Sequence, residues 1–491
     1  MIAAFGLVLV LALGLACSTA RAAEHQKPED FFVASGRFGA VLFFFLSVGE
    51  TYSIGTILGV PAGVYSHGTG FLAWFLGYIL LAFPVGYFLN PCIWRAGRRT
   101  GAVTLPDMFR RHFDSRTLEL VITLSSIAFL LPLGVMQFVG LQTVLSALGL
   151  GHLPPLLTLG VAGALVLLMV AIAGIRGPAR VAVLKDALML LAVLAAGLAA
   201  LSVLLRMPAA PAAAPMAAPK LPGAQWKTDL FAMSTIVLQS VGFCLVPQTV
   251  ASVFTARSPR TVRRAQSLMP LYMAMFPLLV LTAYAARRLG GGAGTGDPNG
   301  VFVRIACDLL PGWMAGIVLA AASLSAMVVL SGICLALGPL VSRNLVPGLD
   351  GERQKRYARL VMAGYMVLSV AGATGFHGLM TAINTVFYFG ITQILPALVS
   401  MLFLRRVRPG AIALSLLLGD AVSIGLHAGG VPLGGINPGL VGLGANALLL
   451  LLLTRRFPGE FREPTENRRL RSDPERVSPV AQKEIRHDAI A

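Results

Sequence analysis

Charged residues are scarce in this sequence. Asp, Glu, Lys and Arg make up 12% of its 491 residues, whereas 56% are hydrophobic. With a mean hydropathy of +0.78, such a chain lacks the polar surface that a soluble domain requires. The composition therefore predicts an all-α polytopic protein of the lipid bilayer, placed in the cell (inner) membrane.

Acidic residues are the scarcest charges, with 21 Asp and Glu against 39 Lys and Arg, which gives a net charge of +18. This excess does not indicate a nucleic-acid partner, because the arginines cluster in short loops between apolar runs. A basic cytoplasmic face against anionic lipid accounts for that distribution.

Cysteine is also scarce, and three common catalytic sequence motifs are missing. The 5 cysteines show no CxxC spacing, so neither a disulfide framework nor a metal cluster is supported. A P-loop, an HExxH motif and a GxSxG motif are all missing from the sequence. We therefore expect a protein that is not an enzyme and has no cofactor other than a coupling ion, Na⁺ or H⁺.

Long apolar runs are what the sequence has in abundance. Because about 20 helical residues cross the hydrocarbon core, the runs predict about thirteen transmembrane helices. They cover residues 2–20, 38–66, 70–90, 118–146, 153–175, 181–205, 227–253, 267–286, 313–341, 357–376, 379–404, 410–428 and 437–454.

The connections between these runs alternate in basic charge. Arginines are frequent in 95–116, 257–264 and 343–359, whereas 67–69 and 429–436 contain neither Lys nor Arg. Since basic loops stay in the cytoplasm, this predicts an external N-terminus and a cytoplasmic C-terminus.

Residues 1–22 have two interpretations. The run is either the first transmembrane helix or a signal-like segment that is cleaved, because its end at Ser18-Thr19-Ala20-Arg21-Ala22 resembles a cleavage region. The basic region that usually opens such signals is missing.

Two of the apolar runs are interrupted by polar residues. The first, from Phe38 to Gly68, reads Ser47-Val48-Gly49-Glu50-Thr51-Tyr52-Ser53 in its middle, and the second contains polar residues from Gln239 to Gln248 around Pro247. Charged residues at membrane depth are costly and usually face a cavity, and a broken helix frees backbone groups that can bind an ion or a solute.

The order of the runs predicts two inverted repeats of five helices each, which together form a ten-helix (5+5) transporter core. The first repeat covers 38–205 and the second 227–404, and each begins with an interrupted helix. The remaining parts are a cytoplasmic lead-in, an external Ala/Pro linker, two accessory transmembrane helices and a disordered cytoplasmic tail. They occupy residues 23–37, 206–226, 405–455 and 456–491, respectively.

Several motifs resemble the sodium:solute symporter family over residues 29 to 455. They are Glu29-Asp30-Phe31-Phe32-Val33-Ala34-Ser35-Gly36-Arg37, Leu58-Gly59-Val60-Pro61-Ala62-Gly63-Val64-Tyr65 and Thr104-Leu105-Pro106-Asp107-Met108-Phe109-Arg110-Arg111. Other features are similar to the monocarboxylate permease branch, namely Gly49-Glu50-Thr51-Tyr52, Pro91-Cys92-Ile93-Trp94-Arg95, Arg176-Gly177 through Lys185-Asp186, Val246-Pro247-Gln248, and Ser258 through Tyr272. The resemblance implies a thirteen-helix transporter of lactate, pyruvate or similar short acids.

The resemblance also implies roles for individual residues. Gly49 and Tyr52 match positions whose backbone carbonyls bind sodium, and Ser325 is the candidate for a third ligand of this metal site in a shifted register. Asp186, which we expect to open a core helix, matches an aspartate of ion coupling. The substrate site is expected at Glu50, Thr51, Ser53, Gln239 and Tyr388.

One position departs from the family pattern. The family has adjacent hydroxyl residues at the sodium site, where this sequence has Val328 and Val329. Either Ser325 or Ser331 serves in a shifted register, or coupling is to protons, or the solute moves down its own gradient. Glu50 is then the natural proton carrier, because a carboxylate at membrane depth is costly to keep charged.

Each candidate also has a structural interpretation. Glu50 is either a pathway residue or a carboxyl bonded across the helix break. Asp186 with Lys185 is either a coupling site or a surface ion pair near a helix end. Asp107 with Arg110 and Arg111 is expected to be a cytoplasmic loop clamp, and Tyr388 either packs in the core or lines the cavity.

The sequence favours a secondary transporter that imports a small organic solute, most simply a short monocarboxylate, by alternating access. Two alternatives are a symporter of another solute such as an amino acid, and a sensor that binds solute without transport. A sensor would need a signalling domain, and the tail after Arg456 has no recognisable one.

Overall fold

The structure is a computed structural model. It describes residues 1–18, 28–207, 225–289, 297–349, 351–404 and 406–459, and only the backbone of Pro28, Glu29, Ser35, Glu50 and Gln225. The predicted linker at 206–226 and tail at 456–491 lie largely outside the described residues, as do residues 19–27.

Within these ranges the chain is helical apart from loops and an isolated β bridge between Phe38 and Ala256. The first five predicted core spans correspond to α4 (Ala40–Thr51) with α5 (Ile54–His67), α6 (Thr69–Thr100), α8 (Arg116–Leu145), α9 (Pro155–Ala173) and α10 (Arg176–Arg206). The next five are α11 (Gln225–Phe243) with α12 (Pro247–Thr255), α13 (Pro259–Leu268) with α14 (Phe276–Arg288), α16 (Gly312–Pro339), α17 (Gly351–Thr374), and α18 (Met380–Ile391) with α19 (Leu395–Phe403).

The other helices lie before, between and after these spans. They are α1 (Ile2–Cys17), α3 (Pro28–Val33), α7 (Leu105–Phe113), α15 (Val301–Leu309), α20 (Pro409–Ala428) and α21 (Pro438–Arg456). Short 3₁₀ or π segments are η1 (Ala34–Gly36), η2 (Ser146–Leu150), η3 (Met269–Met275), η4 (Pro298–Gly300), η5 (Leu340–Leu345) and η6 (Thr392–Ile394).

In the part of the chain that the structure describes, twelve of the thirteen predicted spans have a counterpart of sufficient length and apolarity. Among the described residues, 10 helices are long and apolar enough to cross a membrane, or 12 when each bent pair counts as one span. The remaining predicted span, 2–20, corresponds to the shorter apolar helix α1, which packs against α16 and α10. The boundaries of the two repeats remain a prediction, although both groups of five begin with a broken span as expected.

The two broken spans have identifiable local causes. Between α11 and α12 the axis bends by 43°, and Pro247 occupies the first turn of α12 while Val246 before it is non-helical. Proline disfavours a helical conformation in the preceding residue, so the helix must restart there. Between α4 and α5 the bend is 41°, and the extended residue Ser53 precedes α5.

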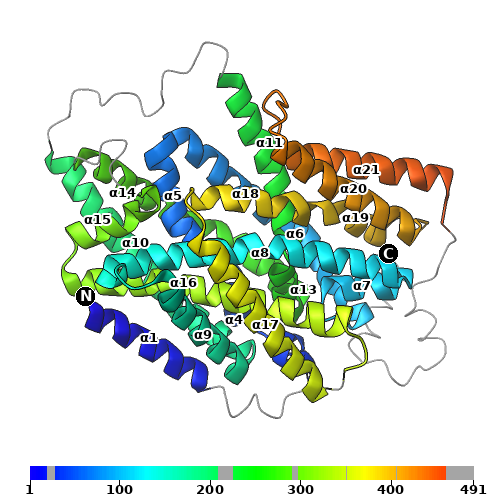
Figure 1. Ribbon diagram of the computed structural model, residues 1–491, viewed down its shortest axis with the longest axis horizontal. Helices are drawn as coiled ribbons and strands as arrows, with labels where there is room; N and C mark the ends of the chain where they lie inside the picture. Colours follow the sequence, from blue (N-terminus) through cyan, green and yellow to red (C-terminus); the bar gives the residue numbers. More distant parts are fainter. Residues whose placement is uncertain (19–27, 208–224, 290–296, 350, 405, 460–491) are drawn as a thin grey trace.

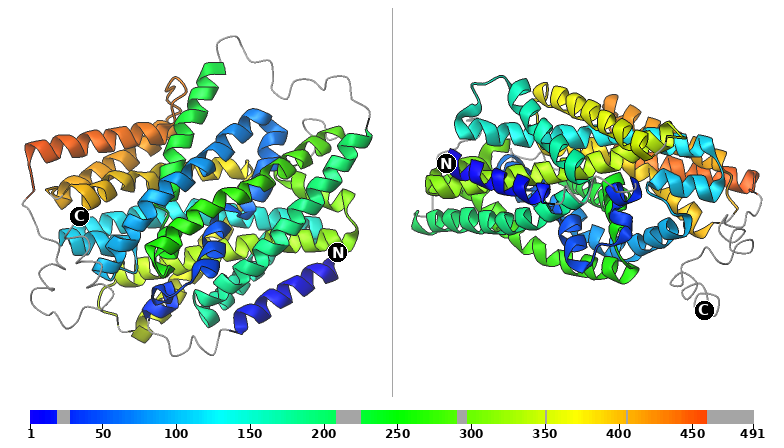
Figure 2. Two further views of the ribbon diagram at one scale, coloured as in Figure 1. Left: turned by 180° about the vertical axis from the view of Figure 1, so that it is seen from behind. Right: turned by 90° about the horizontal axis from the view of Figure 1, so that it is seen from below.

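Helix α16 runs through the centre of the molecule, and 89% of the residues in its most apolar 18-residue stretch are buried. It packs against α10, α1 and α8, and its run of Ala, Ser and Gly allows this close approach. In Figures 1 and 2 the antiparallel pair α20 and α21 lies at one end of the molecule and α1 at the other. The two breaks themselves are buried, at Tyr52 and Ser53 and at residues 244–246, so their freed backbone groups are covered by protein.

Candidate functional site

The break between α4 and α5 brings two opposite helix ends together. Helix α4 ends at Thr51, so its last carbonyls point into the break, while α5 starts at Ile54 with its first N–H groups unpaired within the helix. The C-terminal end of a helix favours a cation and the N-terminal end an anion. The break can therefore bind a cation at the end of α4 and an anion at the start of α5.

A small cavity lies beside the start of α5. The volume open to water-sized groups is about 40 Å³, which suits a solute of a few non-hydrogen atoms. The lining comes from both broken spans and from α6, α8, α16 and α18. Its polar members are Thr51, Ser53, Thr56, Tyr78, Gln137, Gln248, Thr249, Thr381, Asn384 and Tyr388.

Four of these side chains have polar atoms without a hydrogen-bond partner among the described residues. The atoms are Oγ1 of Thr51, both amide atoms of Gln137, Oε1 of Gln248 and Nδ2 of Asn384. Asn384 also shares a side-chain hydrogen bond with Tyr78. Buried polar groups are normally paired, so this cluster of unpaired atoms around one cavity indicates a binding site.

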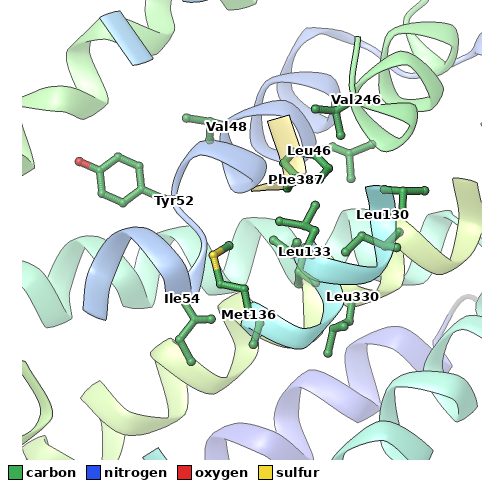
Figure 3. Close-up of a cluster of buried hydrophobic side chains, with 14 of the residues drawn as sticks. Leu46, Val48, Tyr52, Ile54, Leu130, Leu133, Met136, Val246, Leu330 and Phe387 are labelled. Carbon is green, nitrogen blue, oxygen red and sulfur yellow. The ribbon is translucent and has the colours of Figure 1, made fainter. Parts of the chain in front are cut away.

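The rest of the lining is apolar and aromatic. It includes Phe75, Leu133, Met136, Phe243 and Phe387. Figure 3 shows Leu133 and Met136 on one side of the break and the Tyr52 ring pointing away from them on the other. None of the described lining side chains carries a charge. The pocket thus combines an apolar wall with a few neutral polar groups, as small-molecule sites do.

On the far side of the break, the structure buries an ion pair. Lys185 and Asp186 of α10 are both 0% exposed, with Lys185 Nζ 2.6 Å from Asp186 Oδ1. The same ammonium lies 3.4 Å from the Tyr52 carbonyl oxygen, and a Cβ added at Gly49 would meet it at 3.0 Å. The end of α4 is therefore in contact with a lysine.

These contacts decide whether sodium fits at Gly49, Tyr52 and Ser325. The Ser325 hydroxyl donates a hydrogen bond of 2.6 Å to the Tyr52 carbonyl, so two of the three expected ligands bind each other. A sodium ion on this carbonyl would also face the Lys185 ammonium in a low-dielectric interior, where like charges repel strongly. The residues present do not fit a sodium ion at this position.

The predicted residues have different outcomes, and their roles remain predictions. Thr51, Ser53 and Tyr388 line the cavity. Gln239 is buried but lies outside the described lining, and its amide atoms have no partner among the described residues. The side chain of Glu50, expected to be the proton carrier, lies outside the described part of the structure.

The expectation that Asp186 opens a helix or forms a surface pair is wrong. Helix α10 begins at Arg176, which pairs with Asp30, so Asp186 lies well inside the helix and is 0% exposed. Hydropathy misplaced the start because Arg176 and Arg180 are charged.

Sequence reasoning missed Gln137, Gln248 and Asn384 as site residues. Gln137 interrupts a long apolar run in α8, and an amide within a membrane span is a signal that could have identified it.

The expected loop clamp at Asp107 exists with different partners. Asp107 pairs with Arg343 at 3.0 Å and accepts a hydrogen bond of 2.7 Å from Asn344. Arg110 pairs instead with Glu119 at 2.8 Å. The clamp therefore connects α7 and α8 to η5 at the end of α16.

Two broken spans around a cavity with unpaired polar atoms, within a bundle of helices long and apolar enough to cross a membrane, are the arrangement expected of a secondary transporter. The particular family follows from comparison with known proteins. The model of the sodium:solute symporter family matches residues 31–417, and the chain belongs to this family. It is accordingly an integral membrane symporter of a small organic solute.

Individual relatives cover nearly the whole chain. A monocarboxylate transport permease protein of Rhizobium johnstonii is 28% identical, over 93% of this chain and 96% of that protein. The uncharacterized symporter YhjB of Bacillus subtilis is 26% identical, over 83% of this chain and 85% of YhjB. YodF of the same organism, also an uncharacterized symporter, is 25% identical, over 88% of each.

The fold is shared with a solved transporter. A Na⁺-coupled sialic acid symporter in a substrate-bound outward-open state superposes with a TM-score of 0.76 at 15% identity, over 94% of this chain and 98% of that chain. This likeness confirms the predicted fold class.

Proposed function

We propose that the protein imports a short-chain monocarboxylate, of the pyruvate or lactate type, by alternating access. The observation that carries this proposal is the small cavity at the start of α5, where unpaired polar atoms of several helices converge. A carboxylate there would accept hydrogen bonds from the first N–H groups of α5, which form the positive end of the helix.

The side chains of the cavity suit one carboxylate better than two. Thr51, Gln137 and Asn384 offer neutral donors, and the described lining supplies no Lys or Arg to balance a second negative charge. The apolar wall at Leu133, Met136 and Phe387 would receive the short carbon chain. The name of the Rhizobium johnstonii relative supports the same solute class.

Transport then requires the cavity to open to each side in turn. The breaks at 52–53 and 244–246 supply short non-helical segments that can absorb this movement. Membership in the sodium:solute symporter family supports coupling to an ion gradient.

Uptake of labelled pyruvate and lactate into proteoliposomes tests the proposal. Saturable uptake, inhibited by other short monocarboxylates and insensitive to succinate, is the expected result. Transport of alanine but of neither acid would instead assign an amino-acid symporter. Binding of pyruvate with no uptake under any imposed gradient would assign a sensor.

A further inference from the structure

Lys185 is a fully buried lysine in the middle of a transport protein. Lysine is almost never fully buried unless it is paired, and here the partner is the adjacent Asp186, also 0% exposed. Removing two charges from water is costly, and an apolar pair would fill the same space more cheaply. The pair therefore needs a reason beyond packing.

The surroundings of the ammonium are those of a cation site. Besides Asp186, Lys185 Nζ faces the Tyr52 carbonyl at 3.4 Å. Tyr52 follows the last residue of α4, where the carbonyls of a helix end carry partial negative charge. Helix α16 contributes Ser325, whose hydroxyl is bonded to the same carbonyl. The Tyr52 hydroxyl donates in turn to the carbonyl of Tyr272 in η3, so it is turned away from the ammonium.

Two neighbouring positions of α16 lack an oxygen ligand. Val328 and Val329 line a second, small cavity of about 20 Å³ together with Gly49, and its polar side chains, Gln248 and Ser252, come from α12. Valine offers no oxygen to a cation, so the two positions at which the family pattern has hydroxyls contribute none here. The loss of oxygen ligands and the presence of a lysine occur at the same place.

We propose that the Lys185 ammonium replaces sodium at the end of α4, as a cation tethered to the protein. The proposal rests on the proposed transport function and goes further by stating that the solute is carried without sodium at this site. It also explains the buried Asp186, which balances the charge that the lysine brings into the interior.

The first test compares uptake in sodium and in choline at constant ionic strength, with the full-length protein in proteoliposomes. Initial rates of pyruvate uptake should agree within about twofold, whereas ligand coupling usually changes affinity by at least about fivefold. A fivefold or larger loss of uptake in choline would overturn the proposal. Failure to carry any monocarboxylate in either medium would reject the proposed function and leave the next test decisive.

The second test needs no solute. The melting temperature of the purified protein is measured in NaCl and in KCl, since a bound ion stabilises the folded state. The wild type should melt at the same temperature in both salts. A variant with Lys185→Ala, Val328→Ser and Val329→Ser leaves Asp186 unbalanced and adds two oxygens, so sodium should raise its melting temperature.

Two control variants complete the design. The double variant Lys185→Gln with Asp186→Asn removes both charges, and its melting temperature should be the same in NaCl and KCl. This control shows whether a sodium response of the triple variant comes from a new binding site or from destabilisation alone. Lys355→Ala removes another buried lysine, one paired with Glu352 away from the cavity, and should not respond either. Stabilisation of the wild type by NaCl over KCl, or a folded triple variant without any sodium response, would each contradict the proposal.

Discussion

Gln137 is the described lining residue with the most unpaired polar atoms. It is 0% exposed, and neither of its amide atoms has a partner among the described residues. An unpaired polar group in the interior costs about 1–3 kcal/mol, so this position weakens the fold. Such a cost is expected where a bound solute supplies the missing partner.

Replacing Gln137 with Leu tests this role. A hydrogen bond to a charged group contributes about 1.5–3 kcal/mol, so loss of the amide should raise the KM for pyruvate about tenfold to hundredfold. The melting temperature should stay equal or rise, because an unpaired buried group is removed. Concentration-dependent uptake and thermal unfolding give the two readings.

Ser369→Ala is the matched control for that substitution. Ser369 lies in α17, is 0% exposed and shares a side-chain hydrogen bond with Tyr365, so it is a buried polar residue that is not part of the cavity lining. Its KM should be that of the wild type. Equal KM values for Gln137→Leu and the wild type would show that Gln137 does not bind the solute.

At the scale of elements, the accessory pair α20 and α21 shows how helices pack without a hydrophobic driving force in lipid. A Cβ at Gly442 of α21 would lie 2.0 Å from the Ser423 hydroxyl and 2.6 Å from the Gly419 carbonyl of α20. Small residues thus let the two backbones approach closely. Gln393 of η6 bonds Ser423 at 3.1 Å and accepts from Asn446 at its backbone oxygen, which joins the pair to the core.

Gly442→Val should therefore destabilise the protein. The added side chain meets backbone as well as a side chain, and overpacking of this kind typically costs about 1–3 kcal/mol. Gly444→Val on the same helix is the control, because a Cβ there meets nothing within 4 Å. Melting temperatures of the two variants in detergent should differ clearly, and equal values would contradict close packing of α20 on α21.

For the whole molecule, the order of the spans could be predicted because the hydropathy of each segment does not depend on how the helices pack against one another. The second break could be predicted because polar residues from Gln239 to Gln248 surround Pro247, which disfavours a helical conformation in the residue before it. The burial of Gln137 and of the Lys185–Asp186 pair could not be predicted, since apolar residues predominate around α8 and α10 and only packing decides which side turns inward. The fold could therefore be predicted from the sequence, whereas the place of Gln137, Gln248 and Asn384 in the lining of the cavity could not.

The molecule also has two distinct ends along α16. The start of α16 lies beside Met1, since a Cβ at Gly316 would clash with the Met1 carbonyl. At its other end Arg343 and Asn344 join the charged clamp with Asp107 and Glu119. The chain thus gathers arginines and carboxylates at the end opposite its N-terminus.

This asymmetry predicts the orientation in the membrane. Basic residues are retained in the cytoplasm, so the clamp and the last turn of α21, with Arg455 and Arg456, should face inward. A green fluorescent protein fused after residue 459 should fluoresce in cells, whereas alkaline phosphatase at the same point should be inactive. Phosphatase inserted in the turn at 429–436, which has neither Lys nor Arg, should be active. The reverse pattern would place the clamp outside, and the proposed solute would then enter the cavity from the clamp side.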